Sequence, residues 1–190
     1  MATTRKKRGR VQPTFETRRL KVRPYKRSDL AALHALYSDA ENLRYWSVPA
    51  NASLDVTRRQ MRWHLAYKPQ WYVMWAVEEK KSGKLIGMVN YHHRHQTQKR
   101  VDVGWLILPK YQGRGLTTEA MRPVIRHLFD DLGIHKVEAL IMAPNAASQA
   151  LARRLGFRKE GGPIRDRWLN GDRKSTRLNS SHVSESRMPS

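Results

Sequence analysis

Residues 101–120, VDVGWLILPKYQGRGLTTEA, decide the expected fold of this chain. An apolar run predicts a strand that ends at Leu108, because Pro109 lacks the N–H that a strand ladder needs. A loop containing Gly113 and Gly115 follows, and apolar residues then recur at helical spacing. A strand, a glycine loop and a helix N-terminus together leave backbone N–H groups free to bind a phosphate.

The spacing of apolar residues predicts the remaining elements on either side of this segment. Strands are expected at Leu20–Pro24, Trp71–Glu78, Lys84–Tyr91, Lys136–Met142 and Phe157–Leu169. Helices are expected after Ser28 or Asp29, after Ser53 or Asp55, from about Gly115 to Asp131, and after Asn145, a good N-cap whose helix ends at Gly156. Pro123 lies inside the third helix and is expected to kink it or to shift its start.

The last part of the chain departs from this pattern. Asn170-Gly171 is a strong hairpin signal, but no alternating apolar strand follows it. Residues 174–190, KSTRLNSSHVSESRMPS, are instead serine-rich and resemble translated vector sequence fused to a truncated reading frame. We therefore expect a basic, disordered arm at 1–12, one folded domain at 13–172 and a non-native tail at 173–190.

Composition limits the classes of protein and of partner. The chain has 190 residues, no cysteine and a formal net charge of +21, and this length suits one core. It contains no run of 18 apolar residues, so no membrane span is expected, and a cytoplasmic location fits the lack of cysteine. The charge is compatible with a solvated basic surface or with an anionic partner: cofactor phosphates, an acidic substrate or RNA on a ribosome.

Four motifs, in this order, resemble the GNAT acetyltransferase superfamily. They are Leu20–Pro24, Asp102–Leu106 leading into Gln112–Glu119, Asn145–Ser148 leading to Leu155–Phe157, and Trp168–Gly171. Residues 112–117 are similar to the Q/R-x-x-G-x-G/A signature that holds the pyrophosphate of acetyl-CoA, with Thr117 where Gly or Ala is usual. The order looks like the RimJ/RimL branch, which acetylates N-terminal amines of ribosomal proteins. The resemblance implies an α+β fold, an α/β/α sandwich with a mixed, mostly antiparallel sheet whose final strand is missing here.

The resemblance also implies where acetyl-CoA, the cosubstrate, would bind. The expected phosphate contacts are Gln112, Gly113, Arg114, Gly115, Leu116 and Thr117. Asn145 is expected at the pantetheine arm, although a plain N-cap explains this residue equally well. Free N–H groups of Ile107 and Leu108, where the central strand splays, are expected to stabilise the oxyanion of the reaction.

Acetyl transfer to an amine requires a neutral amine and therefore favours a nearby base. Asp102 is the candidate, because it shares a strand face with Gly104 and Leu106 and apolar neighbours raise a carboxyl pKa. Pairing with one of the many arginines is the alternative, and it would lower that pKa. Many family members carry a tyrosine as general acid where this chain has Ala152. The RimL-like pattern has a serine instead, which Ser148 matches, and we expect Ser148 to bond the sulfur or the pantetheine.

Two further groups of residues have competing interpretations. Tyr45, Trp46, Trp75 and Tyr91 are expected to line the acceptor pocket, and the alternative for these aromatic residues is the core. The histidines at 92, 93 and 95 are expected to be a solvated loop rather than a metal site, because strand alternation separates His92 from the other two and no carboxylate is adjacent.

These observations predict an N-acetyltransferase that brings acetyl-CoA and a primary amine together in a ternary complex, as a monomer or homodimer. The amine is expected to be the N-terminus of a ribosomal or other protein. Two alternatives stay open: a polyamine or aminoglycoside acetyltransferase, and a non-catalytic domain that binds RNA or a ribosome through its basic surface. A contact of the basic arm with a ribosome or RNA is expected in either case. A dinucleotide-binding fold is disfavoured, because the third glycine of its motif is absent.

Overall fold

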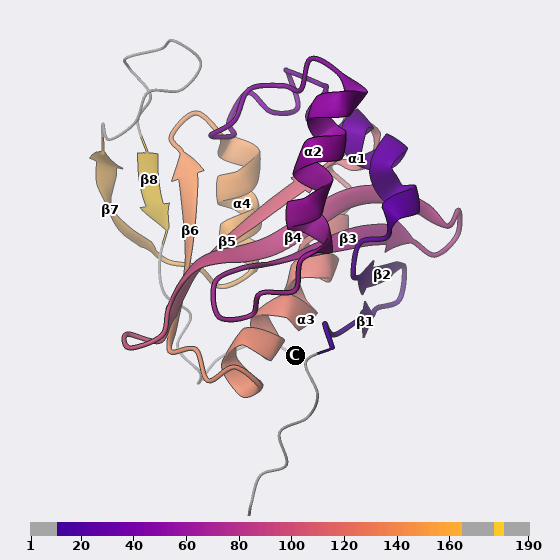
Figure 1. Ribbon diagram of the computed structural model, residues 1–190. Helices are drawn as coiled ribbons and strands as arrows, with labels where there is room; N and C mark the ends of the chain where they lie inside the picture. The colour runs from indigo at the N-terminus through magenta and orange to yellow at the C-terminus, as the bar shows by residue number, and fades with distance from the viewer. Residues whose placement is uncertain (1–10, 165–176, 181–190) are drawn as a thin grey trace, which may run out of the picture.

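The computed structural model describes residues 11–164 and 177–180 (Figure 1). In that part of the chain one eight-stranded sheet has the order β1-β2-β3-β4-β5-β6-β8-β7. The strands are β1 Phe15–Glu16, β2 Leu20–Arg23, β3 Val73–Glu79, β4 Lys84–His95, β5 Arg100–Ile107, β6 Lys136–Met142, β7 Lys159–Ile164 and β8 Arg177–Ser180. Neighbours pair antiparallel except β5 and β6, which are parallel. The expected mixed, mostly antiparallel sheet is confirmed.

Helices cover both faces of the sheet, and the central strand β4 is accordingly buried at every residue from Leu85 to Tyr91. They are α1 Leu30–Tyr37, α2 Leu54–Leu65, α3 Leu116–Asp130 and α4 Ala146–Arg154, with 3-10 turns η1 Arg27–Asp29 and η2 Pro109–Tyr111. On β3, Trp75 packs in the core under α3 and α4, while its neighbour Ala76 packs in a second core under α1 and α2. The result is the three-layered α/β/α arrangement visible in Figure 1.

Local signals set several helix boundaries. The Ser53 hydroxyl accepts a hydrogen bond from the N–H of Val56 and caps α2, which decides between the two expected caps. Gly156 has φ of 87° directly after α4, as a C-terminal glycine should. Pro123 neither starts nor ends a helix: α3 continues through it as one element. Packing of α3 against the sheet therefore outweighs the local cost of this proline.

The sheet opens between its two parallel strands. β5 and β6 pair only from Arg100 with Lys136 to Asp102 with Glu138. Beyond this point β5 runs on to Ile107 without β6 beside it, while the rest of β6 pairs with β8. The two strands therefore diverge from Asp102 onward, and side chains and N–H groups of β5 border the resulting gap.

Three expectations about element ends are corrected. The final strand, which was expected to be missing, is present as β8. It lies between β6 and β7, although its sequence shows little alternation of apolar residues. β4 continues through residues that were expected to form a loop and ends at His95. The basic arm is shorter than expected, because Gln12 is buried and its amide donates to Met74 O at 2.7 Å. Residues 1–10, which carry the arm's charges, and most of the tail lie outside the described residues.

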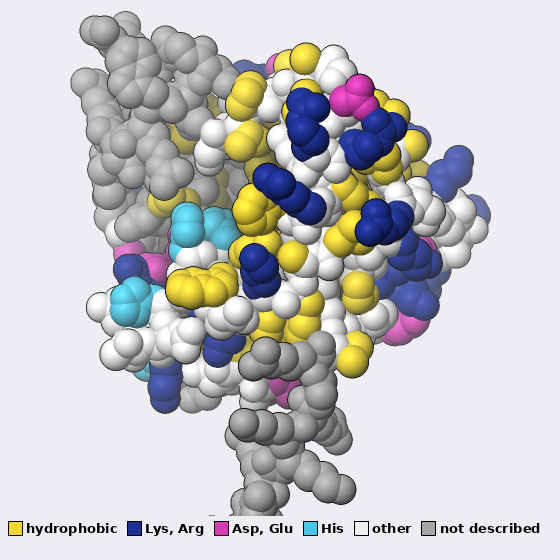
Figure 2. Space-filling model, viewed as in Figure 1, with side chains coloured by type: hydrophobic (Ala, Val, Ile, Leu, Met, Phe, Trp, Pro, Cys, Tyr) yellow, Lys and Arg dark blue, Asp and Glu magenta, His cyan; other side chains and the backbone are white. Residues whose placement is uncertain are grey.

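Positive charge is distributed over the body of the protein and not confined to the arm. Lys and Arg side chains are prominent on the face drawn in Figure 2, with fewer acidic ones between them. Among the described residues no helix has the length and apolar character needed to cross a membrane.

Candidate active site

Two adjoining cavities lie where β5 and β6 diverge. The larger one, of about 710 Å³, is bordered by the end of β5, the loop before α3 and the first turns of α3 and α4. The smaller one, of about 320 Å³, is bordered by β4, β5, β6 and the loop between α1 and α2. Tyr45, Trp46, Trp105, Asn145 and Ser148 line both cavities. A ligand in the large cavity can therefore meet a ligand in the small one at these residues.

The loop before α3 takes its shape from two glycines. Gly113 and Gly115 have φ of 73° and 71°, a left-handed backbone that glycine adopts without steric cost. Gly115 is the N-cap of α3 and no side chain caps this helix, so the N–H groups of the first turn can face an anion. All six residues expected at the phosphates, Gln112 to Thr117, line the large cavity. Their geometry suits a phosphate group, and the contact itself stays a prediction.

An ion pair that the sequence did not reveal holds this loop. Arg19 Nε donates to Glu119 Oε2 at 2.6 Å, and Arg19 Nη1 donates to the backbone oxygen of Arg114 at 3.1 Å. Partial burial raises the pKa of Glu119, but hydrogen bonds from Thr17 and Arg19 outweigh it and leave this pKa below its usual value. Residue 19 thus ties the start of β2 to the first turn of α3.

The two N–H groups expected to be free at the end of β5 differ. The N–H of Leu108 donates to Ile86 O at 2.9 Å, so that expectation is wrong for Leu108. Antiparallel pairing alternates, which turns the N–H of Ile107 away from β4 and toward the gap beside β6. Ile107 lines the large cavity, and it remains the candidate oxyanion donor.

Ser148 is held from two sides at the start of α4. The indole Nε1 of Trp105 donates to Ser148 Oγ at 3.2 Å, and the Ser148 N–H donates to Asn145 Oδ1 at 3.0 Å. Asn145 is therefore the N-cap of α4, and its side chain also borders both cavities. Because Ser148 Oγ accepts from the indole, its own hydrogen can be donated to a ligand atom at the junction.

The four aromatic residues expected at the acceptor pocket divide into two pairs. Tyr45 and Trp46 lie in the loop between α1 and α2 and line both cavities. Trp75 and Tyr91 are fully buried and pack on each other in the core, with ring centroids 5.8 Å apart. Burial also raises the pKa of Tyr91. The core alternative is correct for this second pair, because both side chains point to the α3–α4 face.

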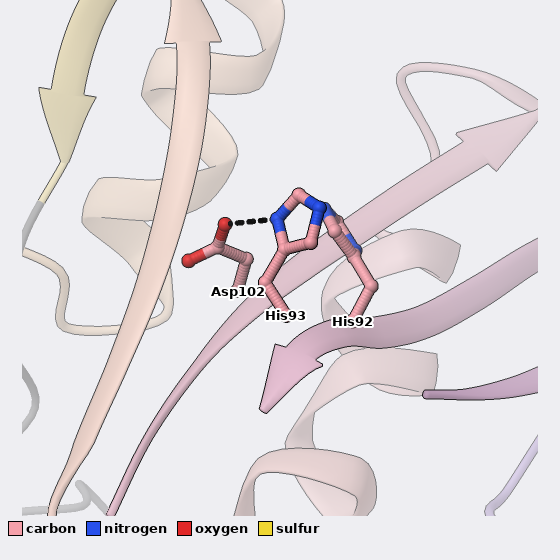
Figure 3. Close-up of side chains that lie close together, drawn as sticks. All are labelled: His92, His93 and Asp102. Atoms are coloured by element: carbon pink, nitrogen blue, oxygen red, sulfur yellow. Dashed lines mark hydrogen bonds and ion pairs between the residues drawn. The ribbon is translucent and has the colours of Figure 1, made fainter. Parts of the chain in front are cut away.

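Asp102 lies at the apex of the gap and is not a lone carboxylate. Its Oδ2 lies 2.9 Å from His93 Nδ1, so the expectation that no carboxylate adjoins the histidines is wrong (Figure 3). His92 lies beside His93, with ring centroids 4.6 Å apart, and its Nδ1 is 3.1 Å from Asn90 Oδ1. All of these residues line the small cavity. A β-bulge brings the two histidines together, and strand alternation in the sequence gives no sign of it.

Gly104 has a steric reason to lack a side chain. A Cβ at this position would lie 2.9 Å from Asn90 Oδ1, closer than carbon and oxygen can pack. Because Gly104 has no side chain, β5 leaves room there for the Asn90 amide, which in turn orients His92. The floor of the small cavity is fixed by contacts between β4 and β5.

Comparison with known proteins connects this geometry to one family. Residues 19–158 match the protein family described as Acetyltransferase (GNAT) domain. The chain is 29% identical over 150 residues to an uncharacterized N-acetyltransferase, YoaA, of Bacillus subtilis, covering 78% of this chain and 85% of that protein. It is 28% identical over 153 residues to the spermidine N(1)-acetyltransferase of Escherichia coli, covering 80% of each. A shorter match, 30% identity over 89 residues, joins 47% of the chain to 49% of YdaF, a putative ribosomal N-acetyltransferase of B. subtilis.

Solved structures share the fold. A GNAT-family acetyltransferase from Bacillus anthracis superimposes with a TM-score of 0.81 at 19% identity, covering 92% of this chain and all of that one. The spermidine N-acetyltransferase of Vibrio cholerae, crystallised with CoA and spermine, gives a TM-score of 0.77 at 21% identity and covers 88% of this chain and 97% of that one.

Proposed function

This chain belongs to the GNAT acetyltransferase family, and we propose that it acetylates the N-terminal amine of a peptide or protein. It is an acyltransferase that uses acetyl-CoA as cosubstrate. The observation that carries the proposal is the meeting of two cavities at Trp105 and Ser148. One cavity has the loop and helix N-terminus that suit the cofactor, and the other leaves room for an amine.

We place the cofactor in the large cavity on the grounds of charge and hydrogen bonding. The open N–H groups at the start of α3 suit the pyrophosphate. Arg44, Arg114 and Arg154 line the same cavity, and their positive charges favour an anion. The gap between β5 and β6 would take the pantetheine arm, whose amides can pair with the N–H groups that β6 leaves unpaired on β5. The thioester then lies near Ser148.

The chemistry at the junction follows from these positions. The neutral amine nitrogen attacks the thioester carbonyl carbon, and the N–H of Ile107 stabilises the oxyanion that forms. The C–S bond then breaks, and the thiolate leaves while the Ser148 hydroxyl donates to the sulfur. One proton of the amine must be taken up before attack, and the Asp102 end of the small cavity is where a base is available.

Charge in the small cavity supports a peptide N-terminus over a polyamine. Among the described residues that line it, Asp102 is the one carboxylate, and His93 already pairs with it. A polyamine carries several ammonium groups, which need several acidic partners, and the chain as a whole carries +21. A peptide presents one amine followed by an uncharged backbone. Similarity to a putative ribosomal N-acetyltransferase supports the same acceptor class.

A polyamine is the second candidate acceptor. The observation that favours it is the match to a spermidine acetyltransferase over 80% of both chains. That match is longer than the ribosomal one, so the acceptor has to be decided by experiment. A binding domain without catalysis is not supported by the membership of this chain in an enzyme family.

The test is a competition between acceptors. The purified chain is incubated with acetyl-CoA and an equimolar mixture of short peptides with free N-termini, spermidine and an aminoglycoside, and products are identified by mass spectrometry. We expect kcat/KM for the best peptide to exceed that for spermidine by at least about tenfold, which corresponds to about 1.4 kcal/mol. Preferential acetylation of spermidine would replace the peptide proposal with the polyamine one.

A further inference from the structure

We propose that His93 is the group that accepts the amine proton and that Asp102 acts through it as a positioning residue. This inference rests on the proposed function and assigns a residue that the sequence did not suggest. Its foundation is the 2.9 Å contact between His93 Nδ1 and Asp102 Oδ2 in the small cavity (Figure 3). Asp102, the carboxylate that was expected to be the base, therefore belongs to an imidazole–carboxylate pair with His93.

The backbone is distorted to bring this pair together. Pairing of β4 with β5 shifts between His92 and His95, and His93 has φ of 50°. Left-handed backbone is uncommon outside glycine, and strain of this kind is concentrated at functional sites. A regular strand would send residues 92 and 93 to opposite faces. The bulge instead aims both rings into one cavity and gives Asp102 a partner other than the residue opposite it in register, His92.

The pair fixes which nitrogen of His93 can take a proton. An ionised carboxylate can only accept hydrogen bonds, so the imidazole Nδ1 donates to Asp102. The lone pair of His93 is then on Nε2, away from Asp102. Imidazole is the side chain that ordinarily changes protonation near neutral pH, which is where a base for an ammonium works best. A carboxylate that holds imidazole in one tautomer is the second element of a proton-accepting pair.

The location suits proton removal from an acceptor rather than from the cofactor. Asp102 shares its side of β5 with Leu106, which packs in the core under α1 and α2, while the cavity expected to hold the phosphates opens beside α3 and α4. The amine would thus approach the gap from the side of His93, while the thioester would enter the gap from the side of α3 and α4. The His93 side chain is 66% exposed, so a proton it takes up can pass to water.

Other charged groups around the pair are engaged with each other. Glu138, opposite Asp102 on β6, pairs with Arg100 at 3.3 Å and with Lys136 at 3.1 Å. The titratable side chains that line the small cavity together with His93 are Asp102 on β5, His92 on β4 and Tyr45 across the cavity. Arg100 on β5 and Lys136 and Glu138 on β6 lie beside Asp102 in the register of the two strands and outside that cavity.

Protons balance over the transfer from the ammonium to the amide. His93 Nε2 takes one proton from the ammonium, and the neutral nitrogen forms the amide bond as the thioester C–S bond breaks. The nitrogen loses a second proton on collapse of the intermediate, and CoA sulfur gains one. His93 returns its proton to water, so that one proton is released for each amide formed. No oxidant, reductant or further reactant is needed.

The experiment compares pH profiles of kcat/KM for the full chain and three variants, measured with and without a chelator, and tests rescue of a fourth variant, His93→Ala, by added imidazole. His93→Asn is the main variant, because asparagine tolerates the left-handed backbone at this position. Asp102→Asn removes the positioning carboxylate, and His95→Gln is a matched control on the same strand, outside both cavities. The acceptor is whichever amine the wild-type chain acetylates, and circular dichroism checks each fold.

We expect His93→Asn to lower kcat by about 100-fold or more with KM for acetyl-CoA within about threefold of wild type. The fall in rate toward acid pH should disappear from its profile, and added imidazole should restore part of the activity of His93→Ala. Asp102→Asn should be less severe than His93→Asn, and His95→Gln should behave as wild type.

Three results would overturn the inference. Wild-type kcat and an unchanged pH profile in His93→Asn, with Asp102→Asn inactive, would make Asp102 itself the base. Loss of wild-type activity on chelation would mean that the cluster acts through a bound ion. Absence of transfer by the wild-type chain to any amine would remove the proposed function, and this inference with it. In the first two cases the proposed function survives.

Discussion

The indole of Trp105 on β5 donates to the hydroxyl of Ser148 on α4 across the gap where the parallel strands separate, at 3.2 Å. Both residues line the large and the small cavity. This contact fixes the serine oxygen at the point where a thioester in one cavity would meet an amine in the other. It also uses one lone pair of Oγ and leaves the hydroxyl hydrogen for the leaving sulfur.

Replacement of Ser148 should slow the chemical step and leave cofactor binding nearly intact. Ser148→Ala removes one hydrogen bond, worth about 1 kcal/mol, so we expect kcat to fall about 5- to 10-fold. Steady-state kinetics with acetyl-CoA varied gives both constants. Trp105→Phe, which keeps the ring but loses the N–H, should show a smaller fall. A wild-type kcat in Ser148→Ala would exclude any role for this hydroxyl.

The glycine loop should be required for acetyl-CoA binding beyond its effect on stability. Gly115→Ala places a Cβ on left-handed backbone and should destabilise the fold by about 1–2 kcal/mol. Gly133→Ala is the matched control, since Gly133 has φ of 61° after α3, outside both cavities, with open space around its Cβ position.

Thermal unfolding with and without acetyl-CoA separates the two effects. Acetyl-CoA at about 100 times its Kd should stabilise wild type and Gly133→Ala by about 2.7 kcal/mol. The gain should be much reduced in Gly115→Ala. Equal stabilisation of all three proteins would place the cofactor away from the N-terminus of α3.

His64 should make the folded state sensitive to acid. It is buried beside Tyr25 and Tyr37, its Nδ1 has no hydrogen-bond partner among the described residues, and burial lowers its pKa to about 4. The unfolded chain, with a histidine pKa of about 6.5, binds the proton first. The contribution of neutral His64 to the free energy of unfolding is therefore fully present above pH 6.5. It is lost as the pH falls toward 4, and the loss amounts to about 3 kcal/mol.

Denaturant unfolding at several pH values measures this loss. His64→Phe keeps a ring in the same space and removes the titrating group, so its stability should decline less than that of wild type between pH 6.5 and 4. Parallel declines in the two proteins would show that other groups cause the acid sensitivity.

Removal of the buried charge of Arg23 should lower the unfolding free energy strongly. It bonds Asp29 at 2.8 Å and Glu78 at 2.6 Å and is nearly inaccessible to solvent. Arg23→Met leaves two carboxylates without their partner, and we expect a loss of about 3–5 kcal/mol in unfolding free energy. Arg58→Met is the control: it removes an exposed pair with Asp55 on α2 and should cost at most about 1 kcal/mol. Similar losses in both variants would contradict the burial argument.

The basic arm should matter for nucleic acid and not for acetyl transfer. Residues 1–10 contain five Lys and Arg side chains. If they contact RNA, their removal should flatten the slope of log affinity against log salt by up to about four, at 0.7 to 0.9 per contact. Truncation should stop before Gln12, which is anchored to Met74. An unchanged slope for ribosome binding assigns any such contact to the body of the protein.

Local backbone chemistry explains what the sequence could predict. Gly113 and Gly115 occur between a strand and a helix where left-handed backbone is needed, and Asn145 stands directly before a helix whose N–H it caps. Such signals depend on neighbouring residues alone, so the loop, the helix starts and the order of elements could be predicted. β8 could not, since its pairing with β6 and β7 comes from backbone groups rather than from an apolar pattern.

Contacts between distant residues explain what was missed. The pairing of His93 with Asp102 depends on one inserted residue in β4, which changes the face of every later side chain. The N–H of Leu108 was expected to be free, but it donates to a backbone carbonyl on β4. The N–H of Ile107 points away from β4, because hydrogen bonding alternates along an antiparallel pair. Aromatic residues occur both in pockets and in cores, so the sequence left both locations open for Trp75 and Tyr91. The packing of α3 against the sheet places the two side chains in the core.

The most direct test of the proposed acetyl transfer follows a labelled acetyl group. The chain is incubated with acetyl-CoA carrying ¹³C in the acetyl carbonyl and with the peptide mixture, and NMR and mass spectrometry locate the label while a thiol reagent measures free CoA. We expect the label in an amide on the peptide α-amino nitrogen, with one thiol released for each amide. Thiol release that does not depend on an amine, or binding of acetyl-CoA with no amide on any primary amine, would contradict the proposed transfer.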